Sequence, residues 1–251
     1  MRKPFIAGNW KLNKTVAEAL ELANGLKQQV ADVRDVDIVV GPVFTALHPV
    51  AESLKGSNIA VAAQNCYLEN TGAYTGEVSP LMLKDVGCRY VIIGHSERRQ
   101  IFRESDDFIN QKIKAALAEG LEAIFCIGET LEEREADKTW DVLKTQLRDG
   151  LKGLSQDDMK KIVIAYEPVW AIGTGKTATG DQAQEAHAYV RGQVKELLDQ
   201  ATADAVRILY GGSVKPDNVD GLMAKPDIDG TLVGGASLKA DDFARIVKFQ
   251  A

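Results

Sequence analysis

The chain of 251 residues contains little cysteine and no long apolar run. Its three cysteines, Cys66, Cys88 and Cys126, form no C-x-x-C pair and have no histidine at zinc-ligand spacing, which argues against a disulfide framework or a structural zinc site. No apolar stretch approaches the roughly 18 residues that a membrane span requires. These absences favour a reduced, cytoplasmic protein that makes no use of a membrane.

Basic residues do not dominate the sequence either. Lys and Arg number 30 against 36 Asp and Glu, which gives a formal net charge of -6, and no basic block offers a surface for nucleic acid. Near the amino terminus, Asn9, Lys11 and Asn13 interrupt any apolar stretch of signal-peptide length, so no secretion signal is expected. An anionic ligand must therefore be held by local groups.

Short apolar runs of strand length, by contrast, recur about eight times along the chain. They are nearly continuous rather than alternating, as in parallel strands that are covered by helices on both faces. The runs lie at residues 5–7, 37–40, 59–62, 90–93, 123–127, 162–166, 206–210 and 230–233.

Segments with helical spacing separate the runs, for example Val16, Leu20, Ala23 and Leu26. Strand and helix alternate without a linker, which predicts one α/β domain over residues 1–251. Periodicity alone does not decide between an open doubly wound sheet and a closed barrel, although a repeat number near eight favours closure. In either fold, the residues that follow the strands form the functional face.

Two residues on that face could move protons. His95 ends the fourth run and precedes a short predicted helix, whose positive end disfavours imidazolium and keeps the ring neutral. Glu167 ends the sixth run just before Pro168, and a half-buried carboxylate at this place is expected to have a raised pKa. Each residue alone would more often be structural or solvated, and His48 and His187, in helical segments, keep that structural interpretation.

The segment after Glu167, residues 168–177, is apolar at its start and carries glycines later, as expected for a lid that excludes water. Its end, Gly175-Lys176-Thr177, matches the end of a nucleotide-binding loop. Trp170 stands where that motif requires its first glycine, so the nucleotide interpretation is rejected.

Glycine pairs follow the last two runs, Gly211-Gly212-Ser213 and Gly234-Gly235. Glycine lets backbone amides approach an oxygen-rich group, and two such turns after the last strands are typical of a phosphate site. Either pair alone would be only a turn. Lys11, after the first run, adds a compact cation on the same face.

With these residues in place, the chain resembles the triosephosphate isomerase family. The matching segments span almost the whole chain, in the order found in the family. They are Gly8–Asn13, Gly72–Ser79, Ile93–Arg99, Cys126–Thr130, Tyr166–Gly175, Tyr210–Val214 and Val233–Leu238.

The resemblance implies a closed (β/α)₈ (TIM) barrel and the cofactor-free, metal-free interconversion of dihydroxyacetone phosphate and D-glyceraldehyde 3-phosphate in glycolysis and gluconeogenesis. It implies that Glu167 is the catalytic base, His95 the electrophile that passes protons to the oxygens of an enediol-like intermediate, and Lys11 a catalytic cation that also contacts substrate. The remaining implied positions are Asn9, Gly173, Ser213, Gly234 and Gly235 for substrate binding, with Glu97 supporting Lys11.

The resemblance also implies a homodimer. The long loop around Gly72–Ser79 would insert into a second subunit and bring Thr75 near the active site of that partner, so a monomer is expected to be weakly active. Loop composition alone indicates only that this segment is functional or mobile.

Two alternatives stay open from the residues themselves. Lys11 could form a Schiff base in an aldolase, or the barrel could bind a sugar phosphate without catalysis. Metal-dependent isomerisation is less expected, since the chain has only three histidines.

Overall fold

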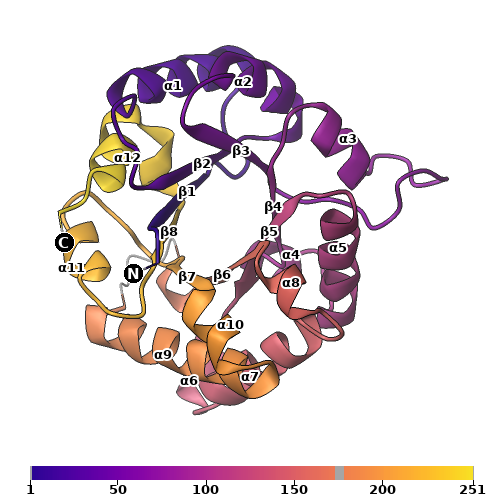
Figure 1. The fold of residues 1–251 in the computed structure, drawn as a ribbon, viewed down its shortest axis with the longest axis vertical. Helices are drawn as coiled ribbons and strands as arrows, with labels where there is room; N and C mark the ends of the chain where they lie inside the picture. Colours follow the sequence, from indigo (N-terminus) through magenta and orange to yellow (C-terminus); the bar gives the residue numbers. More distant parts are fainter. Residues whose placement is uncertain (1, 173–177, 251) are drawn as a thin grey trace.

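A computed structural model describes residues 2–172 and 178–250. Within these residues, eight parallel strands close into a barrel in sequence order, β1 to β8, and β1 pairs with both β2 and β8 (Figure 1). This confirms the closed (β/α)₈ fold. The strands are β1 (Phe5–Asn9), β2 (Asp37–Gly41), β3 (Ile59–Ala63), β4 (Tyr90–Ile93), β5 (Glu122–Ile127), β6 (Ile162–Tyr166), β7 (Arg207–Tyr210) and β8 (Gly230–Val233).

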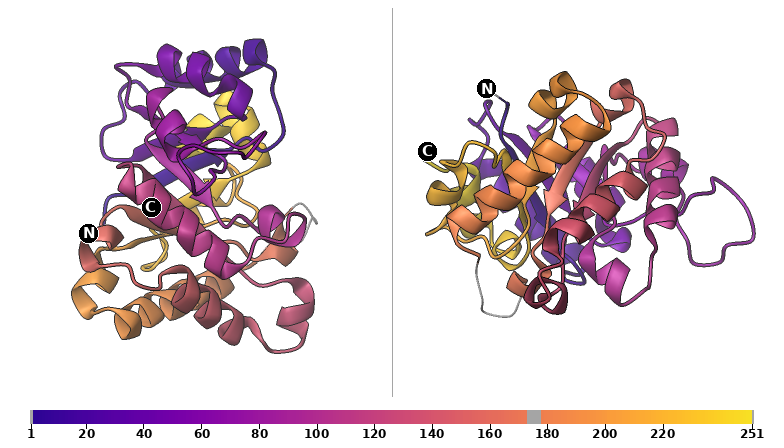
Figure 2. Two further views of the ribbon diagram at one scale, coloured as in Figure 1. Left: turned by 90° about the vertical axis from the view of Figure 1, so that its right-hand side faces the viewer. Right: turned by 90° about the horizontal axis from the view of Figure 1, so that it is seen from below.

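Helices surround the barrel, as the side views in Figure 2 also show. The α-helices in the described part of the chain are α1 (Val16–Gln29), α2 (Leu47–Leu54), α3 (Pro80–Asp85), α4 (Ser96–Gln100), α5 (Asp106–Ala118), α6 (Leu131–Glu135), α7 (Thr139–Gly150), α8 (Gln156–Met159), α9 (Gly180–Leu197), α10 (Gln200–Ala205), α11 (Val219–Met223) and α12 (Ala240–Val247). Short 3₁₀ turns are η1 (Phe44–Ala46), η2 (Val169–Ala171) and η3 (Gly235–Leu238).

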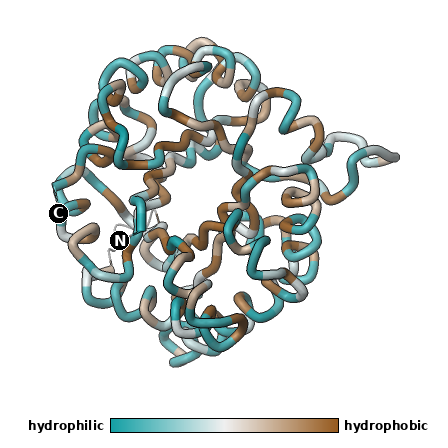
Figure 3. Tube along the Cα trace, viewed as in Figure 1, coloured by the Kyte–Doolittle hydropathy of each residue, from teal (hydrophilic) through white to brown (hydrophobic). Residues whose placement is uncertain are grey.

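Alternate residues of each strand enter two separate cores. In β1, Phe5 and Ala7 pack inside the barrel, whereas Ile6 packs against the surrounding helices. Because both faces of the strand are buried, both must be apolar, which explains the nearly continuous apolar runs. In Figure 3 the strand ring is largely brown and the outer turns of the helices are largely teal.

Helix α1 shows where the helical spacing was only partly right. Its capping box at Thr15 and Glu18 fixes the first turn. The buried face consists of Ala19, Leu22, Ala23 and Leu26, while Val16 is 40% exposed. The buried face therefore differs from the predicted one at Val16, which lies in the first turn of the helix.

Two further features bear on function. The segment after β3 projects from the barrel as a long loop (Figures 1 and 2), where Tyr67 and Tyr74 stack with ring centroids 4.5 Å apart. Among the described helices, none has both the length and the apolar character needed to span a bilayer.

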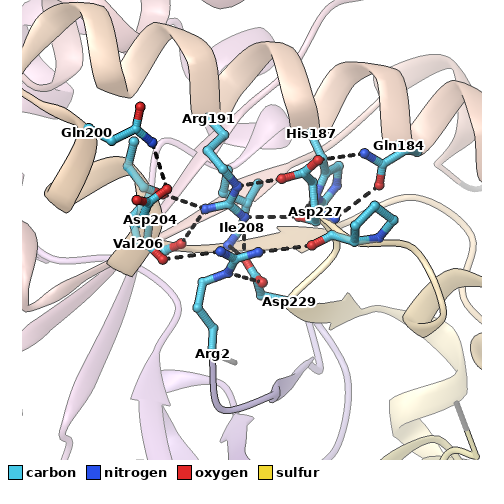
Figure 4. A network of polar contacts seen from close by, with 12 residues as sticks. Arg2, Gln184, His187, Arg191, Gln200, Asp204, Val206, Ile208, Asp227 and Asp229 are labelled. Carbon is cyan, nitrogen blue, oxygen red and sulfur yellow. Dashed lines mark hydrogen bonds and ion pairs between the residues drawn. The ribbon is translucent and has the colours of Figure 1, made fainter.

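The amino-terminal end of the barrel is joined by charged side chains that pair with one another (Figure 4). Arg191 of α9 donates to Asp227 at 2.6 Å and to Asp229 at 2.7 Å, and Arg2 also pairs with Asp229. Asp229 accepts a further hydrogen bond of 2.8 Å from the Ile208 N–H. These bonds connect the starts of β1, β7 and β8 to α9.

Candidate active site

A cavity of about 330 Å³ lies at the carboxyl ends of the strands. It gathers residues that follow five different strands, as expected for a parallel barrel. Seven of the predicted site residues line it, namely Asn9, Lys11, His95, Glu167, Ser213, Gly234 and Gly235. Gly173 lies outside the described residues. Glu97 and Thr75 are not among its lining residues, although Glu97 contacts Lys11.

Lys11 follows β1 in a left-handed backbone conformation, with φ of 51°. The Asn9 side-chain oxygen accepts its N–H at 3.0 Å, and Gln64 donates to its carbonyl oxygen at 2.8 Å. Its Nζ lies 2.8 Å from Glu97 Oε1, which agrees with the predicted support of Lys11 by Glu97. These contacts hold the ammonium over the cavity. No sequence pattern pointed to Gln64, which reaches Lys11 from a distant part of the chain.

His95 caps the short helix α4, whose first residue is Ser96. Its Nδ1 accepts the Glu97 N–H at 3.3 Å, and its Nε2 lies 3.0 Å from Glu167 Oε1. Nδ1 also lies 3.5 Å from Glu97 Oε2. Because Nδ1 accepts the Glu97 N–H, the ring N–H that faces Glu167 is at Nε2. The side chain is buried but its Nε2 faces the base across the cavity.

Glu167 is almost fully buried and is held by two contacts. Oε1 faces His95, and Oε2 accepts the Ser96 N–H at 3.0 Å. Burial alone raises the pKa of this carboxyl, but the contacts with His95, Ser96 N–H and Lys11 together hold its pKa below the ordinary value. The raised pKa expected from sequence is therefore wrong for this geometry, because donors surround the carboxylate. It is ionised and able to accept a proton at neutral pH.

The glycines after β7 and β8 allow close approach. A Cβ on Gly211 would lie 2.7 Å from Glu167 Cγ, and one on Gly212 would lie 2.2 Å from the Tyr210 hydroxyl oxygen. Gly234 faces Lys11, whose Cε would lie 3.6 Å from such a Cβ. Ser213 and Gly235 also line the cavity. Because the glycines have no side chain to cover their backbone, this end of the cavity suits a phosphate group.

One buried carboxylate was missed as a site residue. Glu129 follows β5, and its Oε1 accepts hydrogen bonds from Tyr166 at 3.1 Å, Trp170 at 2.9 Å and Arg134 at 3.0 Å. Its carbonyl oxygen accepts the Val169 N–H. Glu129 therefore anchors the segment after Glu167 to the neighbouring strand. Its position directly after a strand was the signal that could have found it.

The cysteines and possible metal ligands add no further chemistry to this cavity. All three cysteines are buried and unpaired, and burial raises the pKa of Cys66 to about 12. Cys126 is fully buried among the apolar residues inside the barrel. In the described ranges, no three His, Cys, Asp or Glu side chains are grouped so that they could hold a metal ion.

Comparison with known proteins agrees with this geometry. The family model described as "Triosephosphate isomerase" matches residues 4–250. The chain is 66% identical over 251 residues to a protein of Syntrophotalea carbinolica that bears the same name, with all of both chains covered. A protein of that name from Geotalea uraniireducens is 62% identical with 99% of each chain covered, and one from Roseiflexus sp. is 55% identical with 99% and 98% covered.

Proposed function

The chain belongs to the triosephosphate isomerase family, and on that premise we propose that Glu167, His95 and Lys11 are its catalytic residues. The reaction is the interconversion of dihydroxyacetone phosphate and D-glyceraldehyde 3-phosphate, a step of glycolysis. The observation that carries the proposal is the contact of the buried Glu167 carboxylate with Nε2 of His95 inside the cavity that Lys11 also lines.

Glu167 acts as the base. Its carboxylate takes a proton from the carbon next to the carbonyl, the C–H electron pair forms a C=C bond, and the carbonyl oxygen becomes negatively charged. The protonated carboxyl then returns a proton to the adjacent carbon. A base that is 2% exposed suits this step, because the reaction then takes place away from bulk water.

His95 and Lys11 act on the oxygens. The Nε2 proton of His95 is donated to the developing oxyanion and is recovered from the neighbouring hydroxyl, so the ring ends as it began. The Lys11 ammonium lowers the energy of the negative charge on the enediolate and the phosphate. Asn9 and Glu97 position that lysine.

The phosphate lies against Ser213, Gly234 and Gly235, and Gly173 is expected to join them. Support comes from the uncovered backbone that these glycines leave at the cavity wall. Restraint of the phosphate there holds the reacting carbons near Glu167, which contributes through orientation.

We also propose that the chain is one domain and forms a homodimer in the cytoplasm. Large apolar side chains are exposed in β/α units one, three and four, the last two of which are neighbours in barrel order, namely Leu12, Leu81, Met82, Ile101 and Phe102. Burying them against a second copy would remove this apolar surface from water. Thr75, exposed in the loop after β3, would then approach the partner's cavity. Three buried thiols without disulfides fit a reducing compartment.

Sedimentation velocity tests the dimer, with Thr75→Arg as the interface variant. We expect a dimeric wild-type chain and a variant that dissociates and loses most of its activity, because a charged side chain is placed at the contact. A monomeric wild-type chain with full turnover would contradict the proposal.

The decisive test of the site is turnover of D-glyceraldehyde 3-phosphate, coupled to reduction of dihydroxyacetone phosphate. Glu167→Gln keeps the size of the side chain but removes the base, and we expect kcat to fall about a thousandfold. Glu167→Asp keeps a carboxylate but withdraws it by one methylene, so an intermediate loss is expected. A Gln variant with wild-type turnover would remove Glu167 from its role.

The Schiff-base aldolase is not favoured, since an ammonium held in an ion pair with Glu97 is no nucleophile. Borohydride reduction with dihydroxyacetone phosphate should leave the mass of the chain unchanged. A barrel that only binds the sugar phosphate would show no turnover in the same assay.

A further inference from the structure

A second cavity, of about 170 Å³, adjoins the first at Glu167. We call it the rear cavity. Its walls include Ser96, Arg99, Gln100, Arg103, Thr130 and Gln146. Among the described residues, Glu167 is the only one that lines both cavities. The proposed base is therefore the partition between two separate spaces.

The two oxygens of the Glu167 carboxylate are oriented to different sides. Oε1 lies 3.0 Å from Nε2 of His95, which lines the substrate cavity. Oε2 accepts the N–H of Ser96, which lines the rear cavity, at 3.0 Å. A proton on the carboxyl group can thus reach either space by rotation of one torsion, without any movement of the backbone.

The rear cavity has the composition of a water site. Its wall carries amide, hydroxyl, carboxylate and guanidinium groups beside the apolar Ile127 and Val169, and its size allows several water molecules, each of which occupies roughly 30 Å³ in the liquid. Gln100 and Arg103 are exposed on the protein surface, so the cavity reaches solvent on their side. Arg99 fixes the opposite wall, since it donates to the carbonyl oxygens of Gly94 and Cys126.

We propose that the rear cavity binds water and is the route by which the protonated Glu167 exchanges its proton with solvent during turnover. The inference rests on the proposed role of Glu167 as the base. After the carbon-bound proton has been taken, the carboxylic acid passes it to a rear water while that water returns one of its own. No net charge moves, and the isotope of the transferred hydrogen changes.

This route separates two tasks that conflict in a single cavity. The substrate side must exclude water so that the intermediate survives. On the side of the rear cavity, the carboxyl group of Glu167 exchanges its proton with water. The exchange then competes with return of the original proton to the substrate, and the ratio of the two outcomes is a property of the rear wall rather than of the catalytic groups.

The test is turnover of dihydroxyacetone phosphate in D₂O, with the aldehyde product trapped by excess dehydrogenase and its deuterium content at C2 measured by NMR. Gln100→Phe places an apolar ring at the entrance of the rear cavity, and Gln100→Ala is the matched control that removes the amide without filling space. Among the described residues, the exposed Gln100 side chain has no hydrogen-bond or ion-pair partner, so folding is not expected to suffer.

We expect Gln100→Phe to lower the deuterium content of the product at least about threefold, because the rear water is displaced. The Ala variant should leave it unchanged or raise it. For both variants kcat/KM should stay within about twofold of wild type, since no substrate contact changes. A purely structural role of Gln100 would move kcat/KM and leave the isotope ratio alone.

A second variant, Gln146→Met, makes the inner wall apolar at similar length and also removes the two hydrogen bonds between the Gln146 amide and the Gly128 backbone, so its folding is checked by circular dichroism. The double variant combines both changes. If the folded double variant incorporates as much deuterium as wild type, the proposed route is wrong and exchange occurs through the substrate cavity. This outcome differs from failure of the base assignment. If Glu167 were not the base, Glu167→Gln would stay active whether or not the rear cavity is altered.

Discussion

The two ends of the barrel use charged residues in opposite ways. At the carboxyl end, Lys11, His95 and Glu167 face a cavity and each keeps an atom available to a ligand. At the amino end, Arg2 and Arg191 both pair with Asp229. The described charges there are therefore satisfied within the protein. The same chemical groups serve turnover at one end and stability at the other, and the difference lies in what faces them.

Substitution of Lys11 should give the largest effect and should fall on activity alone. For Lys11→Met we expect kcat/KM to drop about ten thousandfold, from lost stabilisation of the enediolate and weaker attraction of the phosphate. Thermal stability should hardly change, because Glu97 is 44% exposed and is solvated once its partner is gone. Lys14→Met, also at a left-handed residue but outside the cavity, is the control. A strongly destabilised Lys11→Met chain would contradict the division between the two ends.

The opposite result is expected at the amino end. Asp229→Asn removes the charge that Arg2 and Arg191 share, which leaves Arg2 without a carboxylate partner and Arg191 with Asp227 alone. We expect the free energy of unfolding to fall by about 4 kcal/mol in urea titrations, with kcat/KM of the folded fraction unchanged. Asp204→Asn, at an exposed carboxylate nearby, serves as the control. Loss of turnover without loss of stability would show that the network acts on the active site.

The buried His187 gives the amino end a pH dependence. Burial lowers the pKa of His187 to about 4 from its ordinary 6.5, although a hydrogen-bond contact with the Asp227 carbonyl works against this. Since the unfolded chain binds the proton more readily, this contribution to stability is complete above pH 6.5 and is lost as pH falls towards 4. The loss amounts to about 3 kcal/mol. His187→Gln should flatten urea-derived stability over that range, whereas a slope equal to wild type would assign the effect to other groups.

The smallest effect should come from an exposed ion pair at the same end. Lys3 and Asp37 lie 2.7 Å apart, but 47% and 31% of their side-chain surfaces are exposed. For Lys3→Ala we expect a change of less than about 1 kcal/mol in the free energy of unfolding, because water and salt screen the pair. A loss as large as that of Asp229→Asn would mean that burial is not what distinguishes these pairs.

Strand positions could be predicted from the sequence because burial on both faces requires a nearly continuous apolar run at each strand. The runs at residues 90–93 and 162–166 coincide with β4 and β6, and β5 begins one residue before its run, at Glu122. Closure of the barrel has no such local signal, since the pairing of β1 with β8 joins Phe5 to Gly230. That contact depends on the geometry of the whole sheet.

The candidate site divides in the same way. His95 and Glu167 follow strands, so their shared face could be predicted, and the resemblance supplied their roles. The reversed pKa shift of Glu167 could not, because it depends on the Ser96 N–H and on His95, which lie about 70 residues away in sequence. Gln64 and Glu129 were not predicted as site residues for the same reason, since each acts through contacts with backbone or side chains that are distant in sequence.

The seam between β1 and β8 has a consequence for biosynthesis. Of the eight strands, β1 leaves the ribosome first and its partner β8 leaves last. Until then the β1 edge exposes backbone donors and acceptors to other chains, as an unpaired edge strand does. The nascent protein therefore passes most of its synthesis as an open sheet with two reactive edges, and a chaperone that shields the β1 edge would act before termination rather than after it.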